Sequence, residues 1–160
     1  MQFPILSVIV FTPIITAVLM LLIPAERKSE VRVTALAAAT FTLLLSIWVY
    51  FSYDLGGPRY QFVEQYSWLP SLGISYYVGV DGINAPLVLL TGVVMFTGVL
   101  ISWKIDDRPR EFFAFLFMLA TGVFGVFVAL DLFMLFFFYE IAVFPMYLLI
   151  ATWGWKVTRE

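Results

Sequence analysis

The sequence predicts an all-α integral membrane protein with five transmembrane helices and an external β-hairpin loop. Of its 160 residues, 62% are hydrophobic and only 12% are charged, whereas a soluble domain carries about 25% charged residues. The apolar residues also gather into five segments, and a helix needs about 20 of them to cross a bilayer. Backbone polar groups in lipid must be satisfied within the segment, so each segment is expected to be helical.

The five helices are expected in one membrane domain that covers residues 1–160. Their expected bounds are 3–23, 33–53, 82–103, 112–130 and 132–153. The first segment lacks the positively charged start of a signal peptide, and we therefore interpret it as a retained helix. Pro13 removes a backbone hydrogen bond in the middle of this helix and is expected to kink it.

The connection 54–81 is long and contains two β-like runs, Tyr60–Tyr66 and Ile74–Val80. A Pro- and Gly-containing turn separates them, which favours a hairpin, interpreted here as an ordered connector. In the first run, alternation places these residues on one face: Tyr60, Phe62, Glu64 and Tyr66. Asp81 is expected to cap the third helix, and Pro86 falls near its first turn.

The basic residues favour one orientation in the membrane. Eight of the nine lie in alternate connections or after the fifth helix: Arg27, Lys28, Arg32, Lys104, Arg108, Arg110, Lys156 and Arg159. Arg59 alone lies in the hairpin loop. The positive-inside rule then predicts an external N-terminus and an internal residue 160. Interfacial aromatic residues agree with these ends; they are Trp48, Tyr50 and Tyr53 outside, and Trp103, Trp153 and Trp155 inside.

The fourth segment carries Thr121, Gly125 and Ala129 at intervals of four. Small residues on one helical face let two membrane helices approach closely. We interpret this pattern as packing without a chemical role.

The chain contains neither histidine nor cysteine. It therefore lacks the usual ligands of haem, zinc and iron–sulfur clusters, and we expect no metal or redox cofactor in this chain. It also lacks a phosphate-binding loop and a basic aromatic patch for nucleic acid. Acid–base chemistry must fall to carboxylates or lysines.

Glu140 is the only charged residue inside an expected span. It lies about 12 Å from the start of the fifth helix, near the middle of a hydrocarbon layer of about 30 Å. A charge there costs about 3 kcal/mol or more, and such residues are usually functional. Every Lys and Arg lies in a loop, so Glu140 is protonated or paired with a cation from elsewhere.

Pro145 lies five residues after Glu140 and frees the carbonyl of Ile141, which makes the helix irregular beside the carboxylate. The alternative is that Glu140 is neutral and only hydrogen-bonds to a neighbouring helix. Its helical face carries Phe136, Phe137, Phe144 and Tyr147, and such rings are expected to favour the neutral acid.

The stretch from Arg110 to Gly154, and within it YEIAVFPMYLLIATWG, resembles the antiporter-like M subunits of bacterial respiratory complex I (NuoM type). The VGVDGIN segment, residues 78–84, and the external hairpin are similar too. Family members have about fourteen helices, so the resemblance makes this sequence an N-terminal portion.

The resemblance implies a subunit of a proton-translocating NADH:quinone oxidoreductase in the bacterial cytoplasmic membrane, with other membrane subunits of complex I as partners. Glu140 would be the carboxylate that exchanges protons with a lysine on a later helix or a neighbouring chain. Quinone, FMN and iron–sulfur clusters would belong to other subunits. Two alternatives remain: a D-type subunit of a multisubunit sodium/proton antiporter, and a structural membrane fragment without transport.

Overall fold

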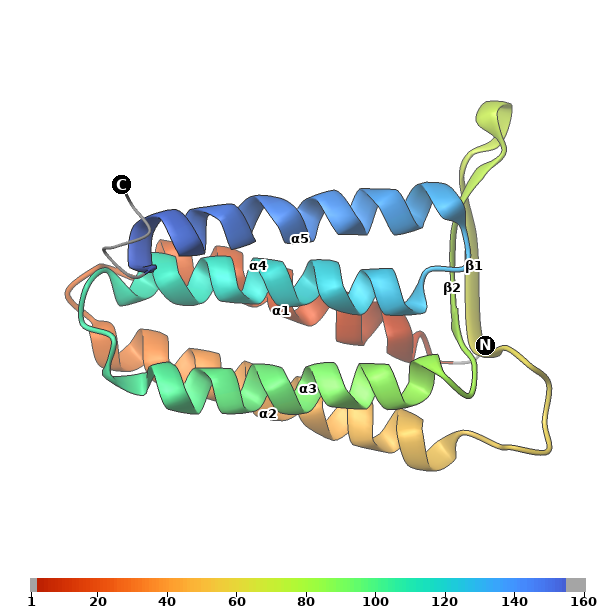
Figure 1. Cartoon of the computed structure of the whole chain (residues 1–160), viewed down its shortest axis with the longest axis horizontal. Coiled ribbons are helices and arrows are strands. Elements are labelled where there is room, and N and C mark those ends of the chain that lie inside the picture. The colour runs from red at the N-terminus through yellow and green to blue at the C-terminus, as the bar shows by residue number, and fades with distance from the viewer. Residues whose placement is uncertain (1–2, 155–160) are drawn as a thin grey trace.

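The computed structural model describes residues 3–154, in which five long helices run side by side and a β-hairpin crosses one end of the bundle (Figure 1). The helices are α1 (Ile5–Leu22), α2 (Lys28–Ser52), α3 (Asn84–Ile101), α4 (Pro109–Val128) and α5 (Leu132–Trp153). Between α2 and α3 lie the strands β1 (Gln61–Leu69) and β2 (Ile74–Val80). All five helices are long and apolar enough to cross a membrane, which confirms the predicted fold class.

Helix α4 is the centre of the bundle, because it packs against α1, α2, α3 and α5. Its large buried side chains are Phe113, Phe117 and Phe124. Two glycines bring it close to α5. A Cβ atom placed on Gly122 would lie 2.7 Å from the Cα atom of Ala142, and one on Gly125 would overlap the ring of Phe138. The small-residue pattern therefore marks close packing at Gly125, whereas Ala129 lies beyond the helix end and the second close contact is made by Gly122.

Helix α4 ends at Val128, two residues before its expected end. The reason is a contact with the hairpin: Ala129 forms an isolated β-bridge with Val78, and the Leu130 N–H donates to the carbonyl of Tyr77 at 2.9 Å. Helix α5 then begins at Leu132 and ends at Trp153, as expected. The Asp131 side chain caps it by accepting from the Phe133 N–H at 2.8 Å.

Helix α2 begins at Lys28 and not at residue 33. The expectation that Lys28 and Arg32 lie in a loop was therefore wrong. Both residues are helical, and both side chains bind Asp106. Lys28 donates to the Asp106 backbone carbonyl at 2.8 Å, and Arg32 forms a salt bridge with the Asp106 carboxylate at 2.7 Å. Helix α2 thereby extends past its apolar part and is fastened to the α3–α4 connection.

Most of the remaining bounds shift by one to three residues. Helix α1 begins at Ile5, directly after Pro4, and continues through Pro13. Helix α3 begins at Asn84, where the Asp81 carboxylate accepts from the Ile83 N–H at 2.9 Å and the Asn84 N–H at 2.8 Å. This supports the predicted capping role of Asp81. Helix α3 is followed by a short 3₁₀ turn, Ser102–Lys104. Helix α4 begins at Pro109, earlier than expected, because proline is well suited to the first turn of a helix.

The hairpin departs from simple alternation near its start. Gln61 is opposite Val80, but Glu64 is opposite Val78, so β1 contains a bulge, within which Phe62 has a φ of 54°. Phe62 and Glu64 nevertheless share the side that faces the helices, as predicted: Phe62 packs on Trp48 of α2, and Glu64 bonds to Leu6 of α1. A bulge of this kind re-aims the side chains that follow it.

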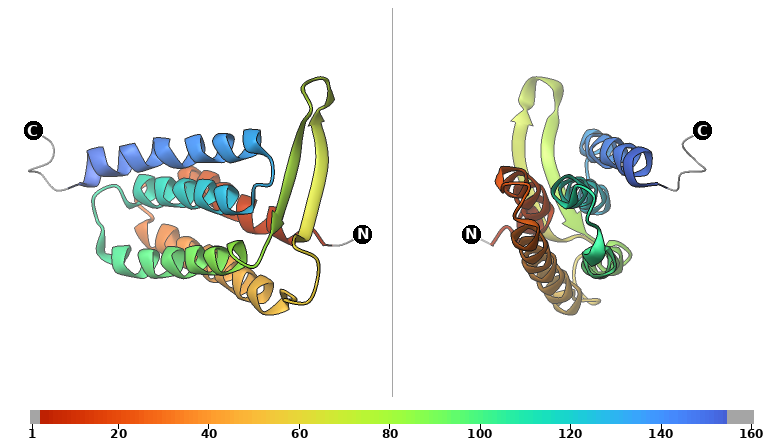
Figure 2. Two further views of the ribbon diagram at one scale, coloured as in Figure 1. Left: turned by 45° about the vertical axis from the view of Figure 1, so that its right-hand side comes forward. Right: turned by 90° about the vertical axis from the view of Figure 1, so that its left-hand side faces the viewer.

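The two ends of the bundle differ in charge as predicted. The hairpin lies at one end, and the α1–α2 and α3–α4 connections lie at the other (Figures 1 and 2). Arg27, Lys28, Lys104 and Arg108 belong to the second end, whereas Arg59 lies in the hairpin connection. The predicted bias of basic residues also included Lys156 and Arg159, and the predicted pattern of interfacial aromatic residues included Trp155. These three residues lie outside the described residues.

Candidate functional site

Glu140 lies midway along α5, on the side that faces away from α4. The buried side chains of this helix are Met134, Phe138 and Pro145. Ala142 meets Gly122 on that same side. Glu140 is exposed instead, because a position two residues from Phe138 points to the opposite side of a helix.

The residues expected to share the face of Glu140 do so. Phe136, Phe137, Phe144 and Tyr147 are all exposed, by 59%, 42%, 57% and 68%. Helix α5 packs on α4, so within residues 3–154 no other helix covers the face that carries Glu140. The structure presents a mid-span carboxylate on an uncovered aromatic face.

No cation in the described part of the chain accompanies this carboxylate. The salt bridges of residues 3–154 join Arg27 to Glu30, Arg32 to Asp106, Arg108 to Asp107 and Arg110 to Glu111. These pairs lie at the end of the bundle opposite the hairpin. A lone carboxylate against lipid costs about 3 kcal/mol or more, so this face suits a further protein segment better than hydrocarbon.

Pro145 lies inside α5 on its buried side, five residues after Glu140. Proline has no N–H to donate to the carbonyl four residues earlier, which here belongs to Ile141. That carbonyl adjoins Glu140 in the sequence. An available backbone acceptor beside a carboxylate gives water or a polar side chain a second hydrogen-bonding group.

Glu64, in the external hairpin, is buried, which sequence reasoning did not predict. It is only 9% exposed. Its carboxylate accepts from the backbone N–H of Leu6 at 2.8 Å and of Ser7 at 3.3 Å, and also from the Ser7 hydroxyl. An acid at a helix N-terminus is favoured by the unpaired N–H groups and the helix dipole. The sequence carried no signal for this contact, because the two residues are far apart in the chain.

Tyr76, on β2, completes this cluster. Its hydroxyl lies 3.0 Å from the Ser7 hydroxyl. The pKa of Tyr76 is raised to about 12, mainly by burial and in smaller part by the nearby Glu64 carboxylate, although the hydrogen bond with Ser7 lowers it. The tyrosine is therefore neutral at physiological pH, and the cluster of Ser7, Glu64 and Tyr76 fastens both strands to the start of α1.

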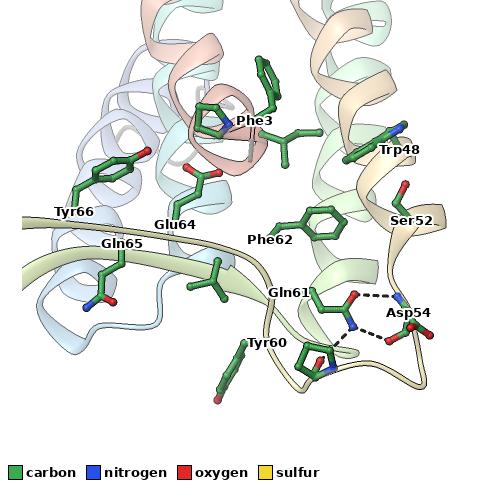
Figure 3. A pocket seen from close by; sticks show the side chains of 14 residues that line it. Phe3, Trp48, Ser52, Asp54, Tyr60, Gln61, Phe62, Glu64, Gln65 and Tyr66 are labelled. Carbon is green, nitrogen blue, oxygen red and sulfur yellow. Dashed lines mark hydrogen bonds between the residues drawn. The ribbon is translucent and has the colours of Figure 1, made fainter. Parts of the chain in front are cut away.

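An open groove runs along this end of the molecule, between β1 and the ends of α1 and α2 (Figure 3). Several of its polar side chains, among them Asp54, Gln61 and Glu64, already have hydrogen-bond partners. Gln61 accepts from the Asp54 N–H at 3.0 Å and donates to the Asp54 carbonyl at 2.6 Å. Trp48 packs on Phe62, with ring centroids 5.7 Å apart. These contacts hold the hairpin connection in place.

Within residues 3–154, no three Asp or Glu side chains come together in the manner of a metal site. Of the carboxylates described above, Glu140 alone combines a mid-span position with an uncovered face.

Sequence comparison finds relatives along almost the whole chain. It is 40% identical over 159 residues to NAD(P)H-quinone oxidoreductase chain 4 2 of Microcystis aeruginosa, and 37% identical over 157 residues to the chloroplastic chain 4 of Chlorokybus atmophyticus. These alignments cover 99% and 98% of this chain but only 29% and 31% of the relatives. The chain thus spans less than a third of the length of the curated relatives it matches. No protein-family model matches it.

Solved structures share the fold. The TM-score is 0.76 against a chain of respiratory complex I from Thermus thermophilus, at 24% identity over 92% of this chain and 29% of that one. It is 0.78 against a chain of the membrane-bound sulfane sulfur reductase, an archaeal respiratory membrane complex, at 19% identity over 94% and 31%. At these identities the likeness establishes the fold alone.

Proposed function

The chain is homologous to part of NAD(P)H-quinone oxidoreductase chain 4, an antiporter-like subunit, and from this premise we propose that it belongs to a proton-translocating membrane subunit of such an oxidoreductase. The observation that carries the proposal is the mid-span carboxylate of Glu140 on an uncovered face of α5. A group that exchanges protons inside a membrane must be titratable and must meet a partner whose charge changes its affinity for the proton.

In this proposal Glu140 shares its proton with a buried lysine that residues 1–160 do not supply. The lysine comes from further helices of a longer chain or from a neighbouring subunit. The segment that carries it packs on the face of α5 that residues 3–154 leave exposed. Approach of the cation favours the carboxylate, and its withdrawal favours the neutral acid. Each unit of pKa change corresponds to about 1.4 kcal/mol, so a modest movement is enough to load or release a proton.

The chain's own part in the proposal is proton transfer without electron transfer. Residues 1–160 contain no histidine or cysteine and so lack the usual ligands of iron–sulfur clusters; in this proposal those clusters, flavin and quinone are held by partner subunits. We place the N-terminus and the hairpin outside the membrane and the end of α5 inside, from the basic bias. The membrane proposed is the bacterial cytoplasmic membrane.

The partners distinguish this proposal from a sodium/proton antiporter subunit. When the native chain is affinity-tagged and purified in mild detergent, flavin- and iron–sulfur-containing subunits should accompany it, together with quinone reductase activity. Recovery only with other antiporter subunits, and without flavin or iron, would overturn the oxidoreductase assignment. The similarity to NAD(P)H-quinone oxidoreductase chain 4 proteins favours the first outcome.

A further inference from the structure

A tryptophan of the hairpin lies over the outer end of the Glu140 face. The Trp68 ring, on β1, packs edge-on against Phe133 and Phe137 of α5, with ring centroids 6.1 Å and 6.0 Å apart and interplanar angles of 65° and 71°. Figure 1 shows the hairpin crossing the start of α5, where these residues lie. We call Trp68, Phe133 and Phe137 the outer aromatic cluster.

The cluster stands directly between Glu140 and the hairpin end of the molecule. Phe137 and Phe133 precede Glu140 by three and seven residues, so all three share one helical face. At about 1.5 Å of rise per residue, Phe137 is three residues, about 4.5 Å, closer to the hairpin end than Glu140. Water that approached Glu140 along this face from the hairpin end would pass these three rings.

We propose that Trp68, packed on Phe133 and Phe137, closes the hairpin end of the path to Glu140. The inference rests on the proposed function, in which Glu140 carries protons. A carrier that is open to both sides at once dissipates the gradient that it builds. Aromatic faces and edges of this kind offer water few of the two to four hydrogen bonds that it needs in a confined site. Protons would then enter from the opposite end or from the covering segment.

The competing explanation is that Trp68 only anchors the hairpin. The chain offers a matched control, because Trp48 also packs on β1, through Phe62. Trp48 comes from α2 and takes no part in the outer aromatic cluster. Removing either ring loosens the hairpin, but only loss of Trp68 should open the way to position 140.

The experiment uses a single cysteine in place of Glu140, since the chain contains no other cysteine. The assembled complex in oriented vesicles is exposed on the hairpin side to a membrane-impermeant maleimide, and labelling of this chain is followed over time. In a Glu140→Cys background, Trp68→Ala should speed labelling about tenfold, the size of effect that lost aromatic contacts have on an opening equilibrium. Trp68→Phe should stay slow, and Trp48→Ala should match the background.

Equal labelling with and without Trp68→Ala would overturn the proposal, as would an equal increase in Trp48→Ala. Phe137→Ala removes the same contact from the α5 side and must give the same increase in labelling. This variant replaces Trp68→Ala in the test if Trp68→Ala does not assemble. The readout is access to position 140 and not pumping. Failure of the proposed function would appear separately, as full pumping by Glu140→Gln with an intact cluster.

Discussion

The carboxylate of Glu64, on β1, accepts a hydrogen bond of 2.8 Å from the backbone N–H of Leu6, in the first turn of α1. This contact joins residues that lie 58 positions apart. It satisfies one of the N–H groups that every helix leaves unpaired at its start. The hairpin is thus fixed to the bundle through a buried acid as well as through aromatic packing.

Glu64→Ala should therefore destabilise the hairpin end of the protein. It leaves the N–H groups of Leu6 and Ser7 without their acceptor in a buried place, at a cost of about 1–3 kcal/mol. Thermal unfolding in detergent should show a lower midpoint, and protease should cut the hairpin connection faster. Gln65→Ala, at the adjacent exposed position, is the control. If both variants unfold alike, Glu64 does not anchor the hairpin.

Tyr76 should make this anchor sensitive to alkali. Its pKa is raised to about 12 from 10.0, so the folded protein holds the proton more tightly than the unfolded chain does. Its contribution is complete below pH 10 and is lost as the pH rises toward 12. A tyrosinate absorbance titration should show one late-titrating tyrosine that Tyr76→Phe lacks. An unchanged titration curve in that variant would assign the late proton to another residue.

The close contact of α4 and α5 should not tolerate a side chain at Gly122. An added Cβ atom would lie 2.7 Å from the Cα atom of Ala142. Gly122→Ala is expected to cost about 1–3 kcal/mol, since the two backbones must separate. Gly98→Ala is the matched control, because nothing lies within 4 Å of its Cβ position. Equal melting temperatures for the two variants would mean that α4 and α5 pack less closely than described.

The orientation is tested by reporter fusions at the two ends of the bundle. Fusions after Glu26 and after Asp107 should report the inside, and a fusion after Arg59 the outside, because the basic residues concentrate at the first two sites. The structure places those two connections at the same end. A fusion after Arg59 that reports the inside would reverse the proposed topology.

The sequence was sufficient to predict the helices because their signal is local. Apolar length identifies each span, and α5 began and ended where expected. The end of α4 was missed because Ala129 leaves the helix to meet Val78, a partner some fifty residues away. The start of α2 was missed because Lys28 and Arg32 bind a distant connection, which no hydropathy pattern records.

The candidate site was predicted only in part, for a similar reason. A lone charge in an apolar run is visible in the sequence, and so Glu140 was found. Its aromatic neighbours followed from helical period. That this face stays uncovered depends on which side of α5 meets Gly122 and Gly125, and that is a property of packing. Glu64 was correctly placed in the hairpin, but its burial was missed because it depends on a contact with α1, 58 positions away in the chain.

The central claim is that Glu140 carries a proton in the intact assembly. Glu140→Gln keeps the shape and part of the hydrogen bonding but removes the titration, so the complex should still assemble. Proton pumping should collapse, coupled quinone reductase activity should fall, and Glu140→Asp should retain part of both. Glu26→Gln, which removes an exposed carboxylate from the α1–α2 connection, should leave both rates unchanged.

The most direct measurement is proton pumping by Glu140→Gln in membrane vesicles, normalised to the amount of assembled complex. The account predicts pumping reduced at least about tenfold, since removal of one essential proton carrier typically costs 10²–10⁴-fold in the step that it serves. Full pumping at normal assembly would contradict it and would leave Glu140 a packing residue.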